Sequence, residues 1–180
     1  FKLIRSDDKS KWVDVDVVSA NINNITEKTL SSPVTTQYIG LWIIQGEQSS
    51  DRAAHIYEFE IFGSEDTRSV ISAPASASSS SAPVSASVDN ILKGKTLLYK
   101  SGEYNNDYQG AYSVDGNVKT KWCTINSGDK YIQFDLGKKY SITKWGVKHA
   151  GSNGEAAMYN TRNFKLIRSD DKSKWVDVDV

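Results

Sequence analysis

The sequence contains a single cysteine, Cys123, among its 180 residues. One thiol cannot form a disulfide within the chain, so the stability of the fold has to come from side-chain packing or from a bound metal. Because Cys123 follows Trp122, a large apolar residue, we expect its thiol to be buried.

An excess of charge of one sign is also lacking, since 22 lysines and arginines balance 22 aspartates and glutamates. Without a basic stripe the chain offers no surface to a phosphate backbone, and we expect no nucleic-acid partner. No stretch approaches the roughly 18 consecutive apolar residues that cross a bilayer, so we also expect no membrane insertion.

Catalytic motifs are missing as well. The sequence holds two histidines and shows no G-x-S-x-G, H-E-x-x-H, phosphate-binding loop or C-x-x-C pattern. Adjacent carboxylates occur at Asp7-Asp8 and Asp170-Asp171, but both pairs fall in a polar turn, where solvated charges are ordinary. We therefore predict that the chain is not an enzyme and has no catalytic residues.

What the sequence does contain is a long internal repeat. Residues Phe1–Val17 (FKLIRSDDKSKWVDVDV) return unchanged as Phe164–Val180. Such an exact return predicts a slice of a tandem repeat array, in which one domain is read from residue 89 to 180 and then from 18 onward. In this circularly shifted order, residues 1–64 form the C-terminal part of a domain and residues 89–180 form an N-terminal part.

Residues 65–88 are predicted to be a linker between these two parts. Ser72–Val88 consists almost wholly of Ser, Ala, Pro and Val, a composition that cannot build a core. The two parts can join within one chain, as a permuted domain, or between chains, as a head-to-tail polymer. The sequence leaves both arrangements open, so head-to-tail self-association is one expected partnership.

Short segments on both sides of this linker predict strands. Three of them are apolar or alternate with period two: residues 38–44, 56–62 and 131–136. In the second segment, Tyr57, Phe59 and Ile61 are expected to face inward. Residues 1–5 and 12–17, like their copies, flank a polar turn and predict a hairpin. Many short strands without helical periodicity indicate an all-β fold, a jelly-roll β-sandwich.

In the shifted order, several motifs follow one another as they do in a known family. They are Asn90-Ile91, Val114-Asp115-Gly116-Asn117, Thr120-Lys121-Trp122-Cys123, Tyr131–Gly137 (YIQFDLG), Ser169-Asp170-Asp171 with Trp175, and Ala54–Gly63 (AHIYEFEIFG). The chain resembles a discoidin-like (coagulation factor 5/8 type C) domain, and is most similar to the family 32 carbohydrate-binding modules of bacterial glycosidases and adhesins. The resemblance covers the whole period except the linker, and it implies a galactose-binding-like jelly roll.

One tight loop offers the oxygen ligands that Ca²⁺ prefers. In Asp115-Gly116-Asn117 and the nearby Thr120, a carboxylate, a hydroxyl and carbonyls turned inward by the glycine bend can converge on one ion. The resemblance implies a further ligand from the closing strand, which Glu58 matches. The predicted metal ligands are therefore Asp115, Asn117, Thr120 and Glu58, around a structural Ca²⁺. The alternative is that Asp-Gly-Asn is only a turn.

The segment from His149 to Arg162 is dense in groups that bond sugar hydroxyls. The resemblance implies that His149, Asn160 and Arg162 contact a terminal, galactose-like sugar, with Glu155 as a further ligand-binding residue. An aromatic platform usually completes such a site. The sequence does not choose among three loop tyrosines: Tyr104, Tyr108 and Tyr159.

These residues also have simpler structural interpretations. Glu155 and Arg162 would then pair with each other and fix the loop, and His149 would be a satisfied strand residue. The polar loop at residues 45–52 is expected to form the other wall of the site, whereas His55, at the start of a strand, is expected to be structural.

Taken together, these observations predict a non-catalytic, lectin-like carbohydrate-binding module of a secreted or surface-attached bacterial protein. Weak single sites in a repeat array would gain strength through avidity. The alternative prediction is a structural repeat of a surface stalk or head-to-tail filament with little or no sugar binding.

Overall fold

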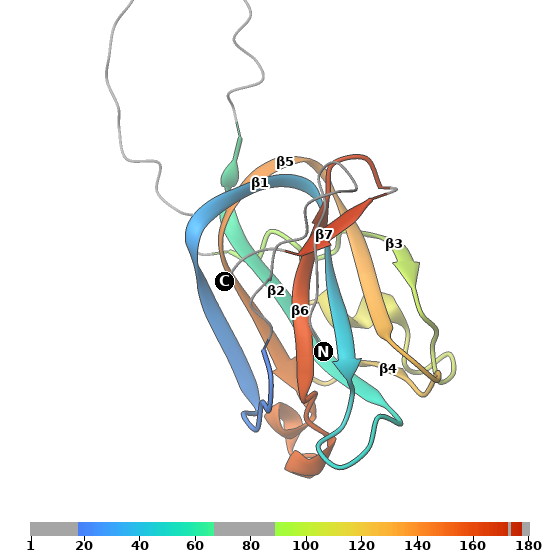
Figure 1. Cartoon of the computed structure of the whole chain (residues 1–180). Helices are drawn as coiled ribbons and strands as arrows, with labels where there is room; N and C mark the ends of the chain where they lie inside the picture. Colours follow the sequence, from blue (N-terminus) through green and yellow to red (C-terminus); the bar gives the residue numbers. More distant parts are fainter. Residues whose placement is uncertain (1–17, 67–88, 173, 178–180) are drawn as a thin grey trace, which may run out of the picture.

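A computed structural model describes residues 18–66, 89–172 and 174–177, which form an all-β fold (Figure 1). Seven strands lie in this part of the chain: β1 (Ile25–Gln45), β2 (Ala54–Glu65), β3 (Thr96–Lys100), β4 (Trp122–Thr124), β5 (Lys130–His149), β6 (Asn163–Ser169) and β7 (Trp175–Asp177). The helical elements described are short 3-10 turns: η2 (Gly110–Val114), η3 (Ala150–Asn153) and η4 (Ala157–Tyr159). The predicted fold class, an all-β galactose-binding-like jelly roll, is confirmed.

The strands pair antiparallel in the order β4-β2-β5-β1-β6-β7, with β3 beside β5. Of the two copies of the predicted hairpin, Phe164–Val180 supplies β6 and β7. The first copy, Phe1–Val17, lies outside the described residues.

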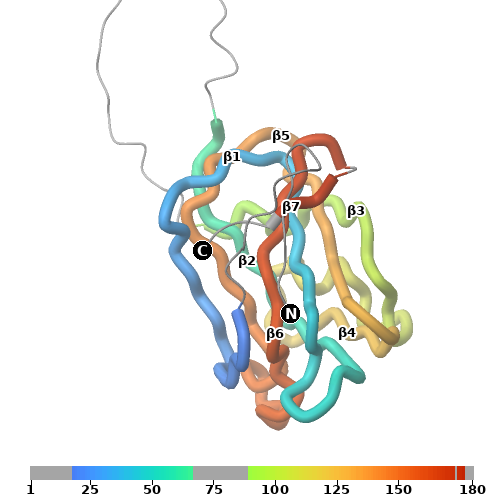
Figure 2. The backbone as a smooth tube through the Cα atoms, in the orientation of Figure 1, coloured from blue at the N-terminus to red at the C-terminus, as the bar shows by residue number. Residues whose placement is uncertain are grey.

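Strands β1 and β5 are long enough to take part in both layers of the sandwich. Their mutual pairing is interrupted between Thr29 and Val34 of β1, and both strands arch over the same end of the molecule (Figure 2). In β5 the bend follows Gly137, whose φ of 84° is a left-handed conformation that glycine adopts freely. The Asp135 carboxylate accepts the Gly137 N–H at 2.8 Å and stabilises this bend.

The core fills the space between the two layers. Phe59 of β2 lies 6.3 Å, centroid to centroid, from Phe134 in the first half of β5, and Trp145 in the second half contacts Phe164 of β6 edge-on at 6.0 Å. All four side chains have no exposed surface. Burying a side chain of this kind stabilises the fold by roughly 2 kcal/mol, so packing alone can replace the absent disulfide.

Strand β2 departs from simple alternation. The pairing with β5 shifts between Ile56 and Glu58, which makes Tyr57 the extra residue of a β-bulge. Ile56, Phe59 and Ile61 join the apolar core, but Tyr57 does not. Tyr57 is buried, as an inward residue should be, with 5% of its surface exposed, but the inserted residue places it outside the apolar cluster.

The two parts of the sequence close into one sandwich within a single chain. Strand β1, from before the predicted linker, lies between β5 and β6, from after it. Cys123 is buried, as expected, with 5% of its surface exposed. Among the residues described, no helix has the length and apolar character that crossing a membrane requires.

Candidate functional site

Four segments distant in sequence meet in a cleft of about 690 Å³ at the end of the sandwich that carries η3, η4 and the β1–β2 loop (Figure 1). Its lining combines three tyrosines, several polar or charged groups and some apolar side chains: Glu47, Ser49, Ser50, Arg52, Ala53, His55, Tyr104, Tyr108, Lys121, Cys123, Ile125, Met158 and Tyr159. The polar loop predicted as one wall of the site does line this cleft. Two of the three predicted aromatic candidates, Tyr104 and Tyr159, are exposed by 55% and 36%.

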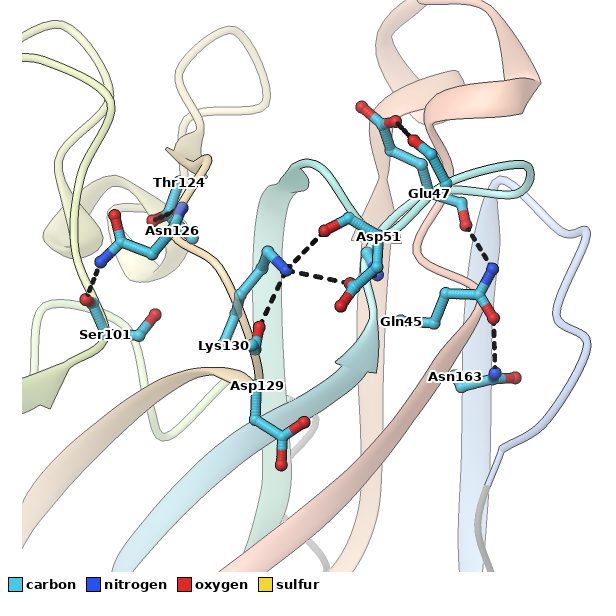
Figure 3. Close-up of polar contacts among 12 residues, drawn as sticks. Gln45, Glu47, Asp51, Ser101, Thr124, Asn126, Asp129, Lys130 and Asn163 are labelled. Atoms are coloured by element: carbon cyan, nitrogen blue, oxygen red, sulfur yellow. Dashed lines mark hydrogen bonds and ion pairs between the residues drawn. The ribbon is translucent and has the colours of Figure 1, made fainter. Parts of the chain in front are cut away.

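A buried lysine fixes the β1–β2 loop. Lys130, at the start of β5, has no exposed surface, and its ammonium donates to the Asp51 carboxylate at 2.9 Å and to the carbonyls of Asp51 and Gly128 at 3.0 Å (Figure 3). Asp51 in turn accepts the Gly46 N–H at 2.9 Å. These bonds satisfy the buried charge and hold the wall of the cleft to the sheet.

Glu155 lies behind the cleft at the centre of a polar cluster. Its carboxylate accepts hydrogen bonds from the Tyr57 hydroxyl and the Lys121 ammonium, both at 2.5 Å. The Lys121 ammonium also lies 5.3 Å from the centroid of the Tyr108 ring, where a cation–π attraction operates. Because these residues come from three segments, the cluster joins the walls of the cleft.

Proton affinities in this cluster are shifted strongly. Burial alone would raise the pKa of Glu155, but the hydrogen bonds from His55, Lys121 and Tyr57 outweigh burial and lower the pKa to about 2. Burial, followed by the bond to Glu155, raises the pKa of Tyr57 to about 12. At neutral pH the cluster therefore holds an ionised carboxylate and a neutral phenol.

His55 belongs to the same cluster. Its Nδ1 lies 3.0 Å from the Lys121 ammonium and 3.4 Å from the Glu155 carboxylate. His55, expected to be structural, therefore lines the cleft and contacts both charged groups behind it.

Cys123 also lines the cleft but is not suited to covalent chemistry. Burial raises the pKa of its thiol to about 11. The thiol therefore stays protonated, whereas a nucleophilic cysteine needs the thiolate form.

The predicted ligand-binding residues fall into two groups. Tyr159 lines the cleft. Glu155 does not line it, but its carboxylate accepts a hydrogen bond from Lys121, which does. His149 instead has no exposed surface: its Nε2 lies 3.0 Å from the Thr26 hydroxyl, and burial lowers its pKa to about 3. Complete burial does not fit a direct contact with a ligand, and His149 belongs to the framework of the strand.

Asn160 and Arg162 hold the loop that follows. Asn160 is fully buried, accepts the Gly151 N–H at 2.7 Å and donates to Asn24 at 2.9 Å. Arg162 donates to the Gln48 side chain at 3.0 Å and does not line the cleft. The carboxylate of Glu155 pairs with Lys121 and not, as the structural alternative had it, with Arg162.

Sequence reasoning assigned Arg52 to a wall of the site only as part of the loop at residues 45–52, and it missed the cleft residues His55 and Lys121. Arg52 is exposed and makes no hydrogen bond or ion pair within the described part of the chain. Lys121 precedes strand β4, which pairs with the start of β2 where His55 lies. Recognising that pairing would have brought both residues together, but no local pattern in the sequence reports it.

A second feature lies away from the cleft, in the loop that follows η2. Asp115 accepts the Asn117 N–H and the Thr120 hydroxyl, both at 2.7 Å, and Gly116 has a φ of 77°. The predicted ligands Asp115, Asn117 and Thr120 thus share one compact turn. Those contacts by themselves also fit the simpler prediction of a turn.

Glu58 distinguishes this loop from an ordinary turn. Its side chain is 1% exposed, and both carboxylate oxygens are buried without a hydrogen-bond partner. Burial, followed by the charge of Asp115, raises the pKa of Glu58 to about 7.

An oxygen-coordinated cation fits this arrangement. Two carboxylates, the Thr120 hydroxyl and backbone carbonyls are hard oxygen ligands of the type that hold Ca²⁺. The described residues contain no group of three or more His, Cys, Asp and Glu side chains that could hold a metal, so carbonyl and hydroxyl oxygens would have to complete the shell.

Comparison with known proteins finds a family resemblance for one part of the chain. Residues 112–180 match the model of an F5/8 type C family described as a NedA-like, galactose-binding domain. Neither the curated proteins nor the solved structures contain a significant match. The matched residues include Lys121, Glu155 and Tyr159, together with all of β4 to β7. This segment is therefore similar to a discoidin-like domain of the F5/8 type C, galactose-binding-like family.

Proposed function

We propose that the chain is a non-catalytic carbohydrate-binding module and that its ligand, a terminal galactose-like sugar, binds in the cleft. The observation that carries this proposal is the meeting of tyrosine rings with both donors and acceptors in one concave site. Tyrosines present flat apolar surfaces to the C–H face of a sugar ring, and the polar groups select its hydroxyls.

The polar groups of the cleft have distinct roles in this proposal. Arg52 supplies N–H donors that are unpaired among the described residues, and His55 supplies a ring nitrogen. Glu47 accepts the Ser50 hydroxyl at 2.5 Å and has a second carboxylate oxygen for a sugar hydroxyl. Lys121, already bonded to Glu155, positions His55 and is not assigned a contact with the sugar.

The affinity of the chain for galactosides, measured by calorimetry, tests this assignment. Tyr159→Ala and Tyr104→Ala are each expected to weaken binding roughly tenfold, because a lost aromatic contact costs about 1 kcal/mol or more. Tyr99→Ala is the matched control, since Tyr99 is 49% exposed on β3 and does not line the cleft. Equal affinities for all three variants would place the sugar elsewhere.

We also propose a structural Ca²⁺ at Glu58 and the Asp115 loop. Its support is the buried, unpartnered carboxylate of Glu58 beside a second carboxylate. Ca²⁺ is expected to raise the Tm of the chain and EDTA to lower it again, because the ion binds only the folded state. Asp115→Asn should abolish the response, whereas Asp129→Asn, whose carboxylate bonds the Trp42 indole, should retain it. A wild-type Tm independent of Ca²⁺ would refute the site.

The alternative, a structural repeat of a surface stalk or filament, draws support from the unchanged return of 17 residues and from the Ser/Ala/Pro-rich segment. Both proposals place the protein at a bacterial cell surface or outside the cell. A glycan array distinguishes them: retention of galactose-terminated glycans supports the binding module, and retention of no glycan at millimolar protein supports the structural role.

A further inference from the structure

The outer edge of β6 receives two separate pieces of the chain. Strand β7 pairs with the C-terminal part of this edge, where Val176 lies opposite Arg168 and Asp177 lies opposite Ile167. At the other end, Val18 and Phe164 exchange two backbone hydrogen bonds of 3.1 Å. The inner edge of β6 is already occupied by β1.

Both pieces point toward the same two positions, Lys165 and Leu166. Strand β7 is antiparallel to β6, so a continuation of its pairing passes Leu166 and then Lys165. The bridge at Val18 is antiparallel as well, so a continuation backward from Val18 passes Lys165 and then Leu166. One edge of a strand can pair with only one neighbour at each position, so the two continuations exclude each other.

The two continuations have the same sequence. Trp12–Val17 is identical to Trp175–Val180, residue for residue. Each side-chain contact that β7 makes with β6 is therefore also available to the earlier copy, which is joined directly to the anchored Val18. In the register of β7, Val13 would stand opposite Arg168.

This register requires one extra residue between Asp14 and Val18. If Asp14 faces Ile167 as its copy Asp177 does, three residues follow before Val18, but only two positions remain on β6 before Phe164. One extra residue on an edge strand is a β-bulge, which edge strands commonly carry. Without the bulge the register would slip by one residue and turn every side chain to the opposite face.

We propose that the outer edge of β6 is a docking site for Trp12–Val17 of the same chain, and that this segment exchanges there with β7. Identical contacts leave only the tethers to distinguish the two occupants. The connection that returns β7 to β6 places Lys172 at a φ of 67°, an uncommon conformation for lysine. The segment that carries Val18 contains a similar residue, since Ala20 has a φ of 55°, so this strain does not favour either occupant. The proposal does not depend on sugar binding.

Disulfide trapping in the full-length chain tests this exchange. In an antiparallel pair, facing residues have Cα atoms about 4.5–5.5 Å apart, a separation that a disulfide spans. V13C/R168C is expected to form a disulfide within the monomer, identified by peptide mass. V176C/R168C is the positive control, because this pair is described in the structure. Native Cys123 is buried and has a raised pKa, so it should remain reduced.

The sharpest control lies one residue away. D14C/R168C places the thiol on the same segment but out of the proposed register, so it measures random collisions. V13C/R168C should be oxidised at least roughly fivefold faster, since facing geometry favours the bond. Equal rates, faster oxidation of D14C/R168C, or disulfides found only between two chains would overturn the proposal.

Discussion

At the scale of single residues, Glu155 shows why the cleft could be only partly predicted. Its place in a polar loop suggested either a sugar contact or a pair with the nearby Arg162. The structure gives it Lys121 and Tyr57 as partners, from segments that the linear sequence keeps far apart. Tyr57 reaches the carboxylate because the bulge of β2 removes it from the core, and alternation in the sequence cannot report a bulge.

Replacing this carboxylate should loosen the cluster. Glu155→Gln leaves the Lys121 ammonium, whose side chain is only 12% exposed, without a counter-charge. A broken charged hydrogen bond of this kind costs about 1–3 kcal/mol, which lowers the Tm by roughly 3–10 °C in a chain of this size. Differential scanning calorimetry measures the shift. Glu65→Gln breaks an exposed pair with Lys138 and should change the Tm little; an equal loss would contradict the assigned role.

Glu58 should make stability depend on pH when Ca²⁺ is absent. Its pKa is about 7 in the folded chain, against an ordinary value of 4.5, so the folded state holds a proton that the unfolded state has lost. The contribution is therefore fully present below about pH 4.5 and is lost as the pH rises through 7. With EDTA present, the Tm should fall between pH 5 and 8.

The variant Glu58→Gln should flatten that profile, because an amide does not titrate. Glu60→Gln is the matched control on the same strand, since Glu60 is paired with Lys148 at 2.8 Å. Thermal melts at several pH values in EDTA provide the comparison. If Glu58→Gln retains the slope of the wild-type chain, another group is responsible.

At the scale of elements, the β1–β2 loop depends on one buried side chain. Lys130→Met should keep the volume but remove the donors that bind Asp51 and Gly128. The loop should then open more often, and trypsin should cleave faster after the exposed Arg52. Mass spectrometry of timed digests measures the rate. Lys144→Met, at a half-exposed pair with Glu27, should leave cleavage unchanged; no difference between the variants would disprove the role of Lys130.

Most strands could be predicted at this scale, because apolar runs and alternation reflect burial directly. Residues 38–44, 56–62 and 131–136 all fall within strands. The lengths of β1 and β5 could not be predicted, since each strand bends through a polar, half-exposed middle section that resembles a loop. Asp135 and Gly137 in β5 signal a turn, and the chain does turn there, but the pairing with β1 resumes beyond it.

At the scale of the whole molecule, the two sequence parts depend on each other. Strand β1 has β5 on one side and β6 on the other, so neither part holds a complete layer. The resemblance that ordered the motifs across the repeat anticipated this mutual dependence. It could not decide between closure within a chain and closure between chains, because the strand contacts are the same in both.

Cutting the connection between the parts should not separate them. A specific protease site introduced at Ser79-Ser80, inside the predicted linker, would leave fragments that carry β1–β2 and β3–β7. They are expected to elute together in native gel filtration and to separate only in denaturant, since β1 is held along both edges. Fragments that separate in native buffer would show that the covalent link is needed.

The central position of β1 has a consequence for biosynthesis. Its partners begin at Lys130 and at Asn163, so β1 is without these strands during synthesis until residues 130–169 have left the ribosome. Contacts between such remote positions also close slowly. The stage before β5 and β6 emerge is therefore the one at which β1 is most exposed to aggregation.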